Sequence, residues 1–247
     1  MQNRSPIKSL KIDYDRSTPQ QVFDFLREQV VAMEILPGQK IPENQLAEQF
    51  GVSRTPIREA IAKLVNLGFI EVRPQRGTFV SKLSITKILE ARFIREALEV
   101  AIICQVTEHH TQELVDQCEA IITLQEQAAG KHDALQFQNL DDLFHQKLAD
   151  FTHFDRAASL IQSEKAHMDR VRNLSLQELG GQYDRVLSQH RNILDAIKSG
   201  DVNKARTATC THMREVLNIL GTVEEMHPDY FEEHIADWQV KPQLPAQ

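Results

Sequence analysis

The sequence predicts a mainly α protein in two parts, an N-terminal winged helix-turn-helix and a C-terminal all-α helical bundle. Three observations lead to this prediction. Helical periodicity gives way to β-type segments only between residues 69 and 81. Long amphipathic segments follow from residue 84 onward. Residues 38–82 carry seven cations and four anions, a local charge of +3, whereas the whole chain carries −7.

Composition limits the classes of protein that this chain can be. Its 247 residues, 41% of them hydrophobic, can form one large domain or two ordinary ones. The three cysteines are too widely spaced for a disulfide framework or a thiolate zinc site, which favours idle thiols. The apolar runs are too short for a membrane span and the N-terminus lacks the apolar core of a signal peptide, so we expect a cytoplasmic protein with no membrane partner.

The first part is expected to hold three helices after a flexible arm at residues 1–18, which are polar and aperiodic. Apolar residues recur at helical spacing from Pro19 to Ile35, and the following Leu-Pro-Gly ends that helix. A second short helix is expected from about Glu43 to Phe50, ending at a glycine suited to a left-handed cap. With the β-type segments, these helices form a winged domain over residues 19–82.

The third helix lies in GVSRTPIREAIAKL, residues 51–64, and has two distinct faces. One face is an apolar stripe that can dock against the first two helices, made of Ile57, Ile61 and Leu64. Arg54 and Arg58 share the other face, within about 40° of each other. In a helix-turn-helix this N-terminal end enters the major groove, where Arg reaches guanine or phosphate and Thr reaches either. Arg54, Thr55 and Arg58 are therefore the candidate DNA-reading residues.

The wing is predicted from two β-type segments, residues 69–73 and 78–81, joined by Pro74-Gln75-Arg76-Gly77. Arg76 at the tip can contact the phosphate backbone or the minor groove, and Gly77 permits close approach. An exposed basic helix that only keeps the protein in solution is the alternative interpretation. The turn, the cationic stripe, the hairpin and the basic tip occur together, which favours DNA binding.

The second part carries only helical signals, in six segments at roughly 84–109, 111–129, 133–150, 156–176, 181–199 and 201–220. They predict a bundle of six or seven helices over residues 83–222. Residues 223–247, with three prolines, are expected to form a loose C-terminal tail.

Four polar residues of the bundle are candidates for a metal site. Asp141 and His145, four apart in LDDLFHQKL, present a carboxylate and an imidazole from one helix face. His190 and His212 lie on two other helices, at the edges of stripes that face the core. A single such histidine is more often a hydrogen-bonded core residue, so from the residues alone a metal site and an ordinary polar core are both open.

PGQKIPENQLAEQFGVSRTPIREAIAKLVNLGFIEVRPQRGTFV, residues 37–80, resembles the DNA-binding domain of the GntR family of bacterial transcriptional regulators along its whole length. The resemblance implies that Arg54, Thr55, Arg58 and Gly77 contact operator DNA. Some relatives have an arginine where this chain has Asn44, which can reach a phosphate or an adenine, but not as an arginine does.

Residues 84–221 resemble the FCD effector domain of the FadR subfamily, through DDLFH, QHRNILDAI and GDVNKARTATCTHM. In its metal-binding branch, the residues matching Asp141, His145, His190 and His212 hold a divalent ion. The resemblance implies such an ion here, zinc first, with nickel or manganese as alternatives. RFIREALE resembles the first effector-domain helix, in which an arginine at the position of Arg95 lines the ligand pocket.

These features together predict a transcriptional regulator, in the first place a repressor, that binds a pseudo-palindromic operator as a homodimer. Three imidazoles and one carboxylate leave two positions on a six-coordinate ion for a small organic or sugar acid, with Arg95 as a second anchor. Ligation needs neutral imidazoles, so metal occupancy should fall below roughly pH 6. The alternatives are an architectural DNA-binding dimer with a structural metal and a metalloenzyme, although no acidic residue is spaced as a general base.

Overall fold

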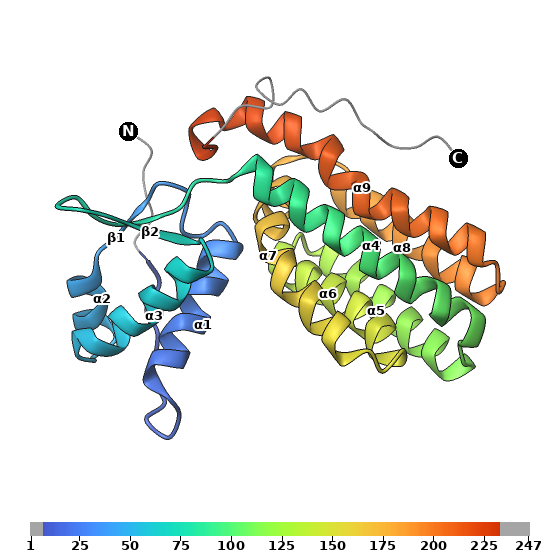
Figure 1. Cartoon of the computed structure of the whole chain (residues 1–247), viewed down its shortest axis with the longest axis horizontal. Helices are drawn as coiled ribbons and strands as arrows, with labels where there is room; N and C mark the ends of the chain where they lie inside the picture. Colours follow the sequence, from blue (N-terminus) through green and yellow to red (C-terminus); the bar gives the residue numbers. More distant parts are fainter. Residues whose placement is uncertain (1–6, 233–247) are drawn as a thin grey trace. The chain divides into compact units, whose positions relative to one another are not determined.

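The structure, a computed structural model, describes residues 7–232 (Figure 1). It divides into two compact units, the first from the N-terminus to Ile85 together with the segment from Glu224, the second from Thr86 to Val223. A winged helix-turn-helix followed by a helical bundle is the fold class that the sequence predicts, and it is confirmed. In the part of the chain that is described, no helix combines the length and the apolar character needed to cross a membrane.

The first unit has three helices and a small sheet, in the chain order α1 (Thr18–Val31), β1 (Lys40–Ile41), α2 (Glu43–Gln49), α3 (Arg54–Asn66), β2 (Ile70–Arg73) and β3 (Gly77–Val80). Helix α3 packs against α1 and α2. Its predicted apolar stripe forms that contact, since Ile57, Ile61 and Leu64 are at most 4% exposed. Burial of one face leaves the polar face of α3 in solvent.

The sheet has three strands in the order β1-β3-β2, all antiparallel. Strands β2 and β3 form the predicted hairpin, with Ile70 opposite Val80 and Arg73 opposite Gly77. Strand β1, with Lys40 opposite Phe79, was not predicted. It is two residues long, too short to show the alternation by which strands are found in a sequence.

Helix α1 ends four residues before the predicted end at Ile35. Met33 adopts a left-handed backbone conformation (φ 60°), and the amides of Glu34 and Ile35 both donate to the carbonyl of Gln29. Met33 and Ile35 are still buried, at 4% and 1% exposed. The apolar pattern therefore continues beyond α1 into a turn that packs in the same core, which explains why the predicted end of the helix is four residues too late.

Residues 7–17, part of the arm expected at residues 1–18, are bonded to α1 and α2, and residues 1–6 lie outside the described part. The Gln21 side chain bonds the backbone of Asp13 on both sides, accepting from its N–H at 3.0 Å and donating to its carbonyl at 2.7 Å. Gln49 donates to the Ile7 carbonyl at 3.1 Å, and Ile12 is only 8% exposed. These side-chain bonds cross from the helices to the arm, so no periodicity in residues 7–17 signals them.

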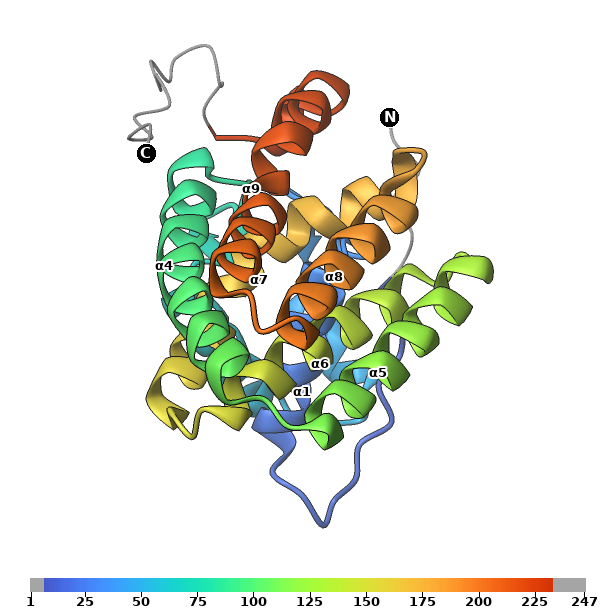
Figure 2. The same ribbon diagram turned by 90° about the vertical axis from the view of Figure 1, so that its right-hand side faces the viewer.

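Six helices form the second unit, namely α4 (Ile85–His109), α5 (Gln112–Gly130), α6 (Ala134–Phe151), α7 (Asp155–Glu178), α8 (Gln182–Lys198) and α9 (Val202–Met226). Figure 2 shows α9 between α4 and α8, and ion pairs join it to both, Arg214 to Glu96 on α4 and Glu215 to Arg185 on α8. Asp201 caps α9, accepting from the Lys204 amide at 3.0 Å.

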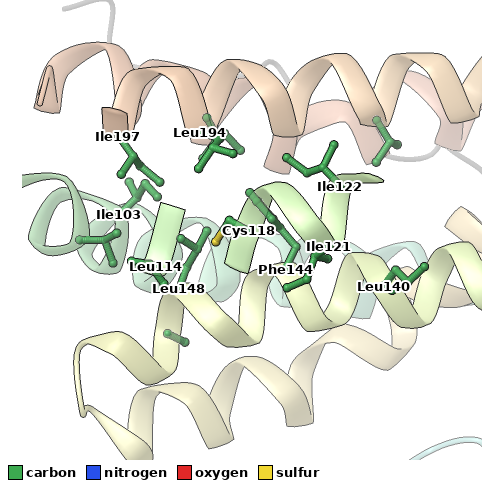
Figure 3. Packing of buried hydrophobic residues seen from close by; sticks show 14 of the residues in the cluster. Ile103, Leu114, Cys118, Ile121, Ile122, Leu140, Phe144, Leu148, Leu194 and Ile197 are labelled. Carbon is green, nitrogen blue, oxygen red and sulfur yellow. The ribbon is translucent and has the colours of Figure 1, made fainter. Parts of the chain in front are cut away.

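The bundle core lies where α5 packs against α6 and α8. Figure 3 shows Leu194 and Ile197 of α8 pointing toward Ile103, Cys118 and Ile122. The three cysteines are free thiols, as the sequence indicated, and burial raises the pKa of Cys118 to about 11. The apolar core surrounds a few polar side chains on α6, α8 and α9, whose burial requires paired partners.

The C-terminal boundary also needs correction, because helix α9 runs on to Met226 and a 3-10 turn follows at Pro228–Tyr230. Phe231 pairs with Leu83 in a parallel bridge, with the Leu83 amide donating to the Tyr230 carbonyl at 2.7 Å. Phe231 is 3% exposed. Residues 223–232 are thus ordered rather than a loose tail, since two buried aromatic side chains outweigh the proline signal. The rest of the predicted tail lies outside the described residues.

Candidate nucleic-acid interface and candidate metal centre

The N-terminal end of α3 presents Arg54, Thr55 and Arg58 to solvent, and the Arg58 side chain is 70% exposed. Pro56 is accommodated there because first-turn amides have no partner within the helix. The arrangement places two guanidinium groups and a hydroxyl at the end of the helix that a helix-turn-helix inserts into the major groove.

Glu43, the first residue of α2, links α2 to the wing strand β3 and to Arg58 on α3. Its Oε1 accepts the hydroxyl hydrogen of Thr78 on β3 at 2.6 Å, and Oε2 lies 3.6 Å from Arg58 Nε. Thr78 is 3% exposed, so the carboxylate is anchored from the buried side. The ion pair engages Nε of Arg58 and leaves the two terminal nitrogens of its guanidinium group available to a ligand. In the sequence, Glu43 is marked only as the expected start of the second helix and as one of four anions in a cationic segment.

The wing tip brings a further cation close to Gly77. Arg76 is exposed, and Gln75 and Gly77 adopt positive φ values of 61° and 113°. A Cβ on Gly77 would lie 3.0 Å from Lys40 Cε, so a side chain there would both strain the turn and displace the lysine. Lys40 is exposed beside the turn. It was missed because its place follows from the unpredicted strand β1.

Two more polar residues border this surface. Asn44 is exposed in the first turn of α2, next to Glu43. Arg73 on β2 lies over the Phe79 ring, 4.7 Å from its centroid, a contact that holds the guanidinium against the sheet. The expected residues therefore lie on α2, α3 and the wing of one unit, with Lys40 and Arg73 as cations that sequence analysis did not select.

The candidate metal residues lie together in the bundle. Asp141 and His145 come from α6, His190 from α8 and His212 from α9. All four are buried, at 7% exposed or less, and one ligand atom from each lies within 4.8 Å of the other three. Asp142, the neighbouring carboxylate, pairs with Lys165 on α7 instead.

His145 is oriented by a carboxylate. Its Nδ1 lies 2.6 Å from Glu99 Oε2, while Glu99 Oε1 accepts from Arg95 Nε at 2.8 Å. Burial raises the pKa of Glu99, but the charge of Arg95 and the hydrogen bonds from His145 and Arg95 outweigh burial and lower it to about 2. Because an ionised carboxylate only accepts, the hydrogen lies on Nδ1 of His145 and the lone pair of the neutral ring on Nε2.

The other two imidazoles are oriented by amides. His190 Nδ1 lies 2.8 Å from Gln125 Oε1, and His212 Nδ1 lies 2.9 Å from Gln189 Oε1. Each glutamine nitrogen has its own acceptor, the Phe137 carbonyl for Gln125 and Glu215 for Gln189, which turns the amide oxygen toward the histidine. Both rings therefore also carry hydrogen on Nδ1 and a lone pair on Nε2.

Lone pairs consequently converge at the centre of the cluster. The Nε2 atoms of His145 and His212 are 3.0 Å apart, and His190 Nε2 lies 3.3 Å from Asp141 Oδ1. Within residues 7–232, Asp141 Oδ2 and His190 Nε2 have no hydrogen-bond partner. Buried acceptors that face one another without a hydrogen are costly, and a divalent cation satisfies all of them at once. The donor set fits a metal ion.

Electrostatics keep this donor set in the form that binds a metal. Burial alone would raise the pKa of Asp141, but Arg172, whose Nη2 lies 2.6 Å from Oδ1, outweighs it and holds the pKa well below its usual range. Burial lowers the pKa of His190, and burial with the neighbouring imidazoles lowers that of His212 well below its usual value. These two rings stay neutral to lower pH than ordinary histidines, so protons compete for their Nε2 atoms only at lower pH.

A pocket opens beside the cluster. It encloses about 480 Å³ between its walls, part of it open to solvent, and Arg95, Arg172, Gln189 and His212 line it. Arg95 is only 1% exposed, and its Nη1 has no hydrogen-bond partner in the described part of the chain. An unpaired guanidinium nitrogen beside a candidate metal centre is suited to bind an anionic group.

The chain belongs to the GntR family of bacterial regulatory proteins. Residues 18–80 match the model described as "Bacterial regulatory proteins, gntR family", and residues 90–215 match the FCD domain. Its relatives are helix-turn-helix transcriptional regulators and not enzymes, so the protein is a DNA-binding transcriptional regulator.

Individual relatives support the assignment over most of the chain. An uncharacterised HTH-type transcriptional regulator of Streptomyces ambofaciens is 33% identical over 216 residues, 87% of this chain and 90% of that protein. The HTH-type transcriptional repressor RspR of Escherichia coli K12 is 32% identical over 214 residues, 87% of this chain and 93% of that protein. The solved structure of E. coli McbR/YncC shares the fold, with a TM-score of 0.72, 22% identity and coverage of 86% of this chain and 99% of that chain.

Proposed function

We propose that this regulator is a repressor whose operator affinity is set by a small carboxylic or sugar acid bound at a divalent metal ion in the bundle. One observation carries the proposal. Three imidazole lone pairs and a carboxylate converge beside a pocket in which a buried guanidinium nitrogen has no partner among the described residues. Such a site attracts a cation first and an anion second.

Asp141, His145, His190 and His212 would hold the ion, and when bound it would offer an acid positions that the protein does not fill. Zinc is the first choice because it accepts imidazole and carboxylate ligands readily, with nickel and manganese as alternatives. Glu99, Gln125 and Gln189 orient the three rings, and Arg172 donates to Asp141 Oδ1, the oxygen that lies 3.3 Å from His190 Nε2.

The acid would bind with its carboxylate at the metal end of the pocket and one oxygen on Arg95 Nη1. Arg95 is linked through Glu99 to the ligand His145, so anchoring the acid and orienting the imidazole depend on the same carboxylate. A change at the pocket therefore reaches α4 and α6 together. This gives the acid a means to favour one arrangement of the bundle over another.

On DNA, two copies of the chain would place their α3 helices in successive major grooves of a pseudo-palindromic operator. Arg54, Thr55 and Arg58 would read bases or phosphates, and Arg76 with Gly77 would contact the backbone from the wing. Asn44 would add a contact from α2. A regulator of this kind acts in the cytoplasm, where the operator lies.

The test is operator release. The operator is first selected from a randomised duplex pool by the wild-type protein, and its binding is followed by fluorescence polarisation. We expect a carboxylic acid from a panel that includes acetate, lactate, hexanoate and gluconate to weaken binding of the zinc-loaded protein, and His190→Ala to lose that response while retaining DNA binding. Tight binding that no acid and no chelator alters would contradict the proposal, and would support an architectural dimer with a structural metal.

A further inference from the structure

The pocket beside the candidate metal centre has two chemically different regions. Its charged region is formed by Arg95, Arg172 and His212, at the cluster itself. The remaining wall is built largely from apolar side chains of α6, α7, α8 and α9, among them Phe137, Met168, Leu176, Val186, Val216 and Ile219. A ligand that places its anionic group in the charged region must lay the rest of its body against hydrocarbon.

Most polar groups of the wall are already engaged with one another, although the amide of Gln182 on α8 has no side-chain partner within the described chain. Gln189 uses its oxygen on His212 and its nitrogen on Glu215. Glu215 in turn accepts from Arg185 at 2.7 Å and from Asn218 at 3.1 Å. These groups have little remaining capacity for the hydroxyls of a ligand.

Ser175 on α7 is also engaged, since its hydroxyl donates to the Arg172 carbonyl at 2.7 Å. Arg95 Nη1 differs from all of these, because it is buried and has no partner within the described chain. The free bonding capacity of the pocket is thus concentrated where a carboxylate would bind, and along the wall it is limited to the amide of Gln182.

We infer that the effector is a monocarboxylic acid with an apolar tail, and not a sugar acid or a dicarboxylic acid. The inference rests on the proposed function, whose acid site it narrows. The carboxylate of such a ligand pairs with the metal end and Arg95, while its tail covers the apolar wall. A second carboxylate, and most of the hydroxyls of a sugar acid, would be buried against hydrocarbon without partners, because the single amide of Gln182 can bond to only one or two of them.

The inference makes a quantitative expectation for a series of straight-chain acids. Each methylene buried on the apolar wall should raise the affinity about fourfold, until the wall is covered. Hexanoate and gluconate have the same carbon chain and one carboxylate each, and differ by the hydroxyl groups of gluconate. Gluconate should therefore bind at least roughly tenfold more weakly than hexanoate.

The experiment is calorimetric titration of the zinc-loaded full-length protein with acetate, butanoate, hexanoate and gluconate. We expect affinity to rise from acetate to hexanoate, with a negative heat-capacity change that grows along the series. Gluconate that binds as tightly as hexanoate, or more tightly, would overturn the inference and leave the proposed acid response standing. Absence of binding by every acid would overturn the acid response and the inference with it.

Two matched variants locate the tail. Val186→Thr introduces a hydroxyl into the pocket wall, where Val186 is 8% exposed, and should weaken hexanoate binding severalfold while leaving acetate unchanged. Val115→Thr makes the same change in the core on α5, away from the pocket lining, and should leave both acids unchanged. Equal hexanoate affinity in wild type and Val186→Thr would overturn the placement of the tail, and folding is checked in both variants by their zinc content.

Discussion

His145 and His212 face each other through Nε2 atoms 3.0 Å apart, although each ring already has an acceptor at Nδ1. Two neutral rings in this arrangement direct lone pairs at one another. The pair is favourable only with a cation or a proton between the nitrogens, and burial lowers the pKa of His212 against a proton. The contact is therefore the clearest single sign of a metal-binding role in the bundle.

Gln125 is expected to control metal affinity without touching the metal. Gln125→Leu removes the acceptor for His190 Nδ1 and frees the ring to turn, which should weaken zinc binding roughly tenfold to a hundredfold. Competition against a chromogenic chelator measures the effect. Gln127→Leu, at an exposed position of the same helix, is the control and should bind zinc like the wild type. Unchanged affinity in Gln125→Leu would show that His190 needs no orientation.

The stability of the metal-free protein should depend on pH through His190 and His212. Their folded-state pKa values lie below the unfolded value of about 6.5, so acid protonates the unfolded chain first. The free energy of unfolding is fully present above about pH 6.5 and should fall as pH drops toward the folded pKa values, by up to about 1.4 kcal/mol per pH unit for each ring.

Denaturant titrations of chelator-treated protein between pH 7 and pH 5 measure this dependence. His190→Gln should show a shallower slope than wild type, whereas His109→Ala, a change at an exposed histidine at the end of α4, should not. Equal slopes in wild type and His190→Gln would contradict the assignment of a buried neutral imidazole.

Glu43 is expected to sharpen operator discrimination while opposing DNA binding in general. Glu43→Gln keeps an oxygen for the Thr78 hydroxyl but loses the charge that faces Arg58. Affinity for a base-shuffled duplex should rise, because one anion near the phosphates is gone, while preference for the selected operator should fall. Polarisation titrations with both duplexes give the ratio.

Two comparisons make the result specific. Glu48→Gln removes the same charge from an exposed position of α2 and should raise binding to both duplexes equally. Arg58→Ala should weaken operator binding roughly tenfold to a hundredfold and leave zinc content unchanged. A discrimination ratio in Glu43→Gln equal to that of Glu48→Gln would show that Glu43 does not position Arg58.

Phe231→Ala should destabilise the DNA-binding unit by about 3–5 kcal/mol, since the ring is 3% exposed and its backbone pairs with Leu83. Thermal unfolding followed by circular dichroism measures the loss, and Val72→Ala, at a position 60% exposed on β2, is the control with little effect. A loss below about 1 kcal/mol would mean that residues 228–232 do not pack as described.

The architecture was largely predictable because the apolar residues of long amphipathic helices recur at a regular spacing in the sequence. The stripe of Ile57, Ile61 and Leu64 gave both the docking face of α3 and, by exclusion, its solvent face. The elements that were not predicted are short or lack periodicity. Strand β1 has two residues, and Tyr230 and Phe231 are two adjacent aromatic residues after a proline, so neither segment produces a pattern in the sequence.

Of the candidate metal centre, only the four candidate ligands were predictable from the sequence. Asp141 and His145 share a helix face at a spacing of four, and His190 and His212 border core stripes, which single them out. Their orienting partners carry no such mark. Glu99 and Gln125 resemble ordinary polar residues of α4 and α5, and only the packing of helices far apart in sequence brings them to the imidazoles.

The central claim, that the cluster holds a metal which an acid can reach, is tested most directly by X-ray absorption at the zinc edge of the loaded full-length protein. We predict the scattering of three imidazoles and oxygen ligands at about 2.0–2.1 Å, one imidazole fewer in His190→Ala, and a changed oxygen shell when hexanoate is added. Sulfur ligands at about 2.3 Å, or fewer than three imidazoles in the wild type, would contradict the account.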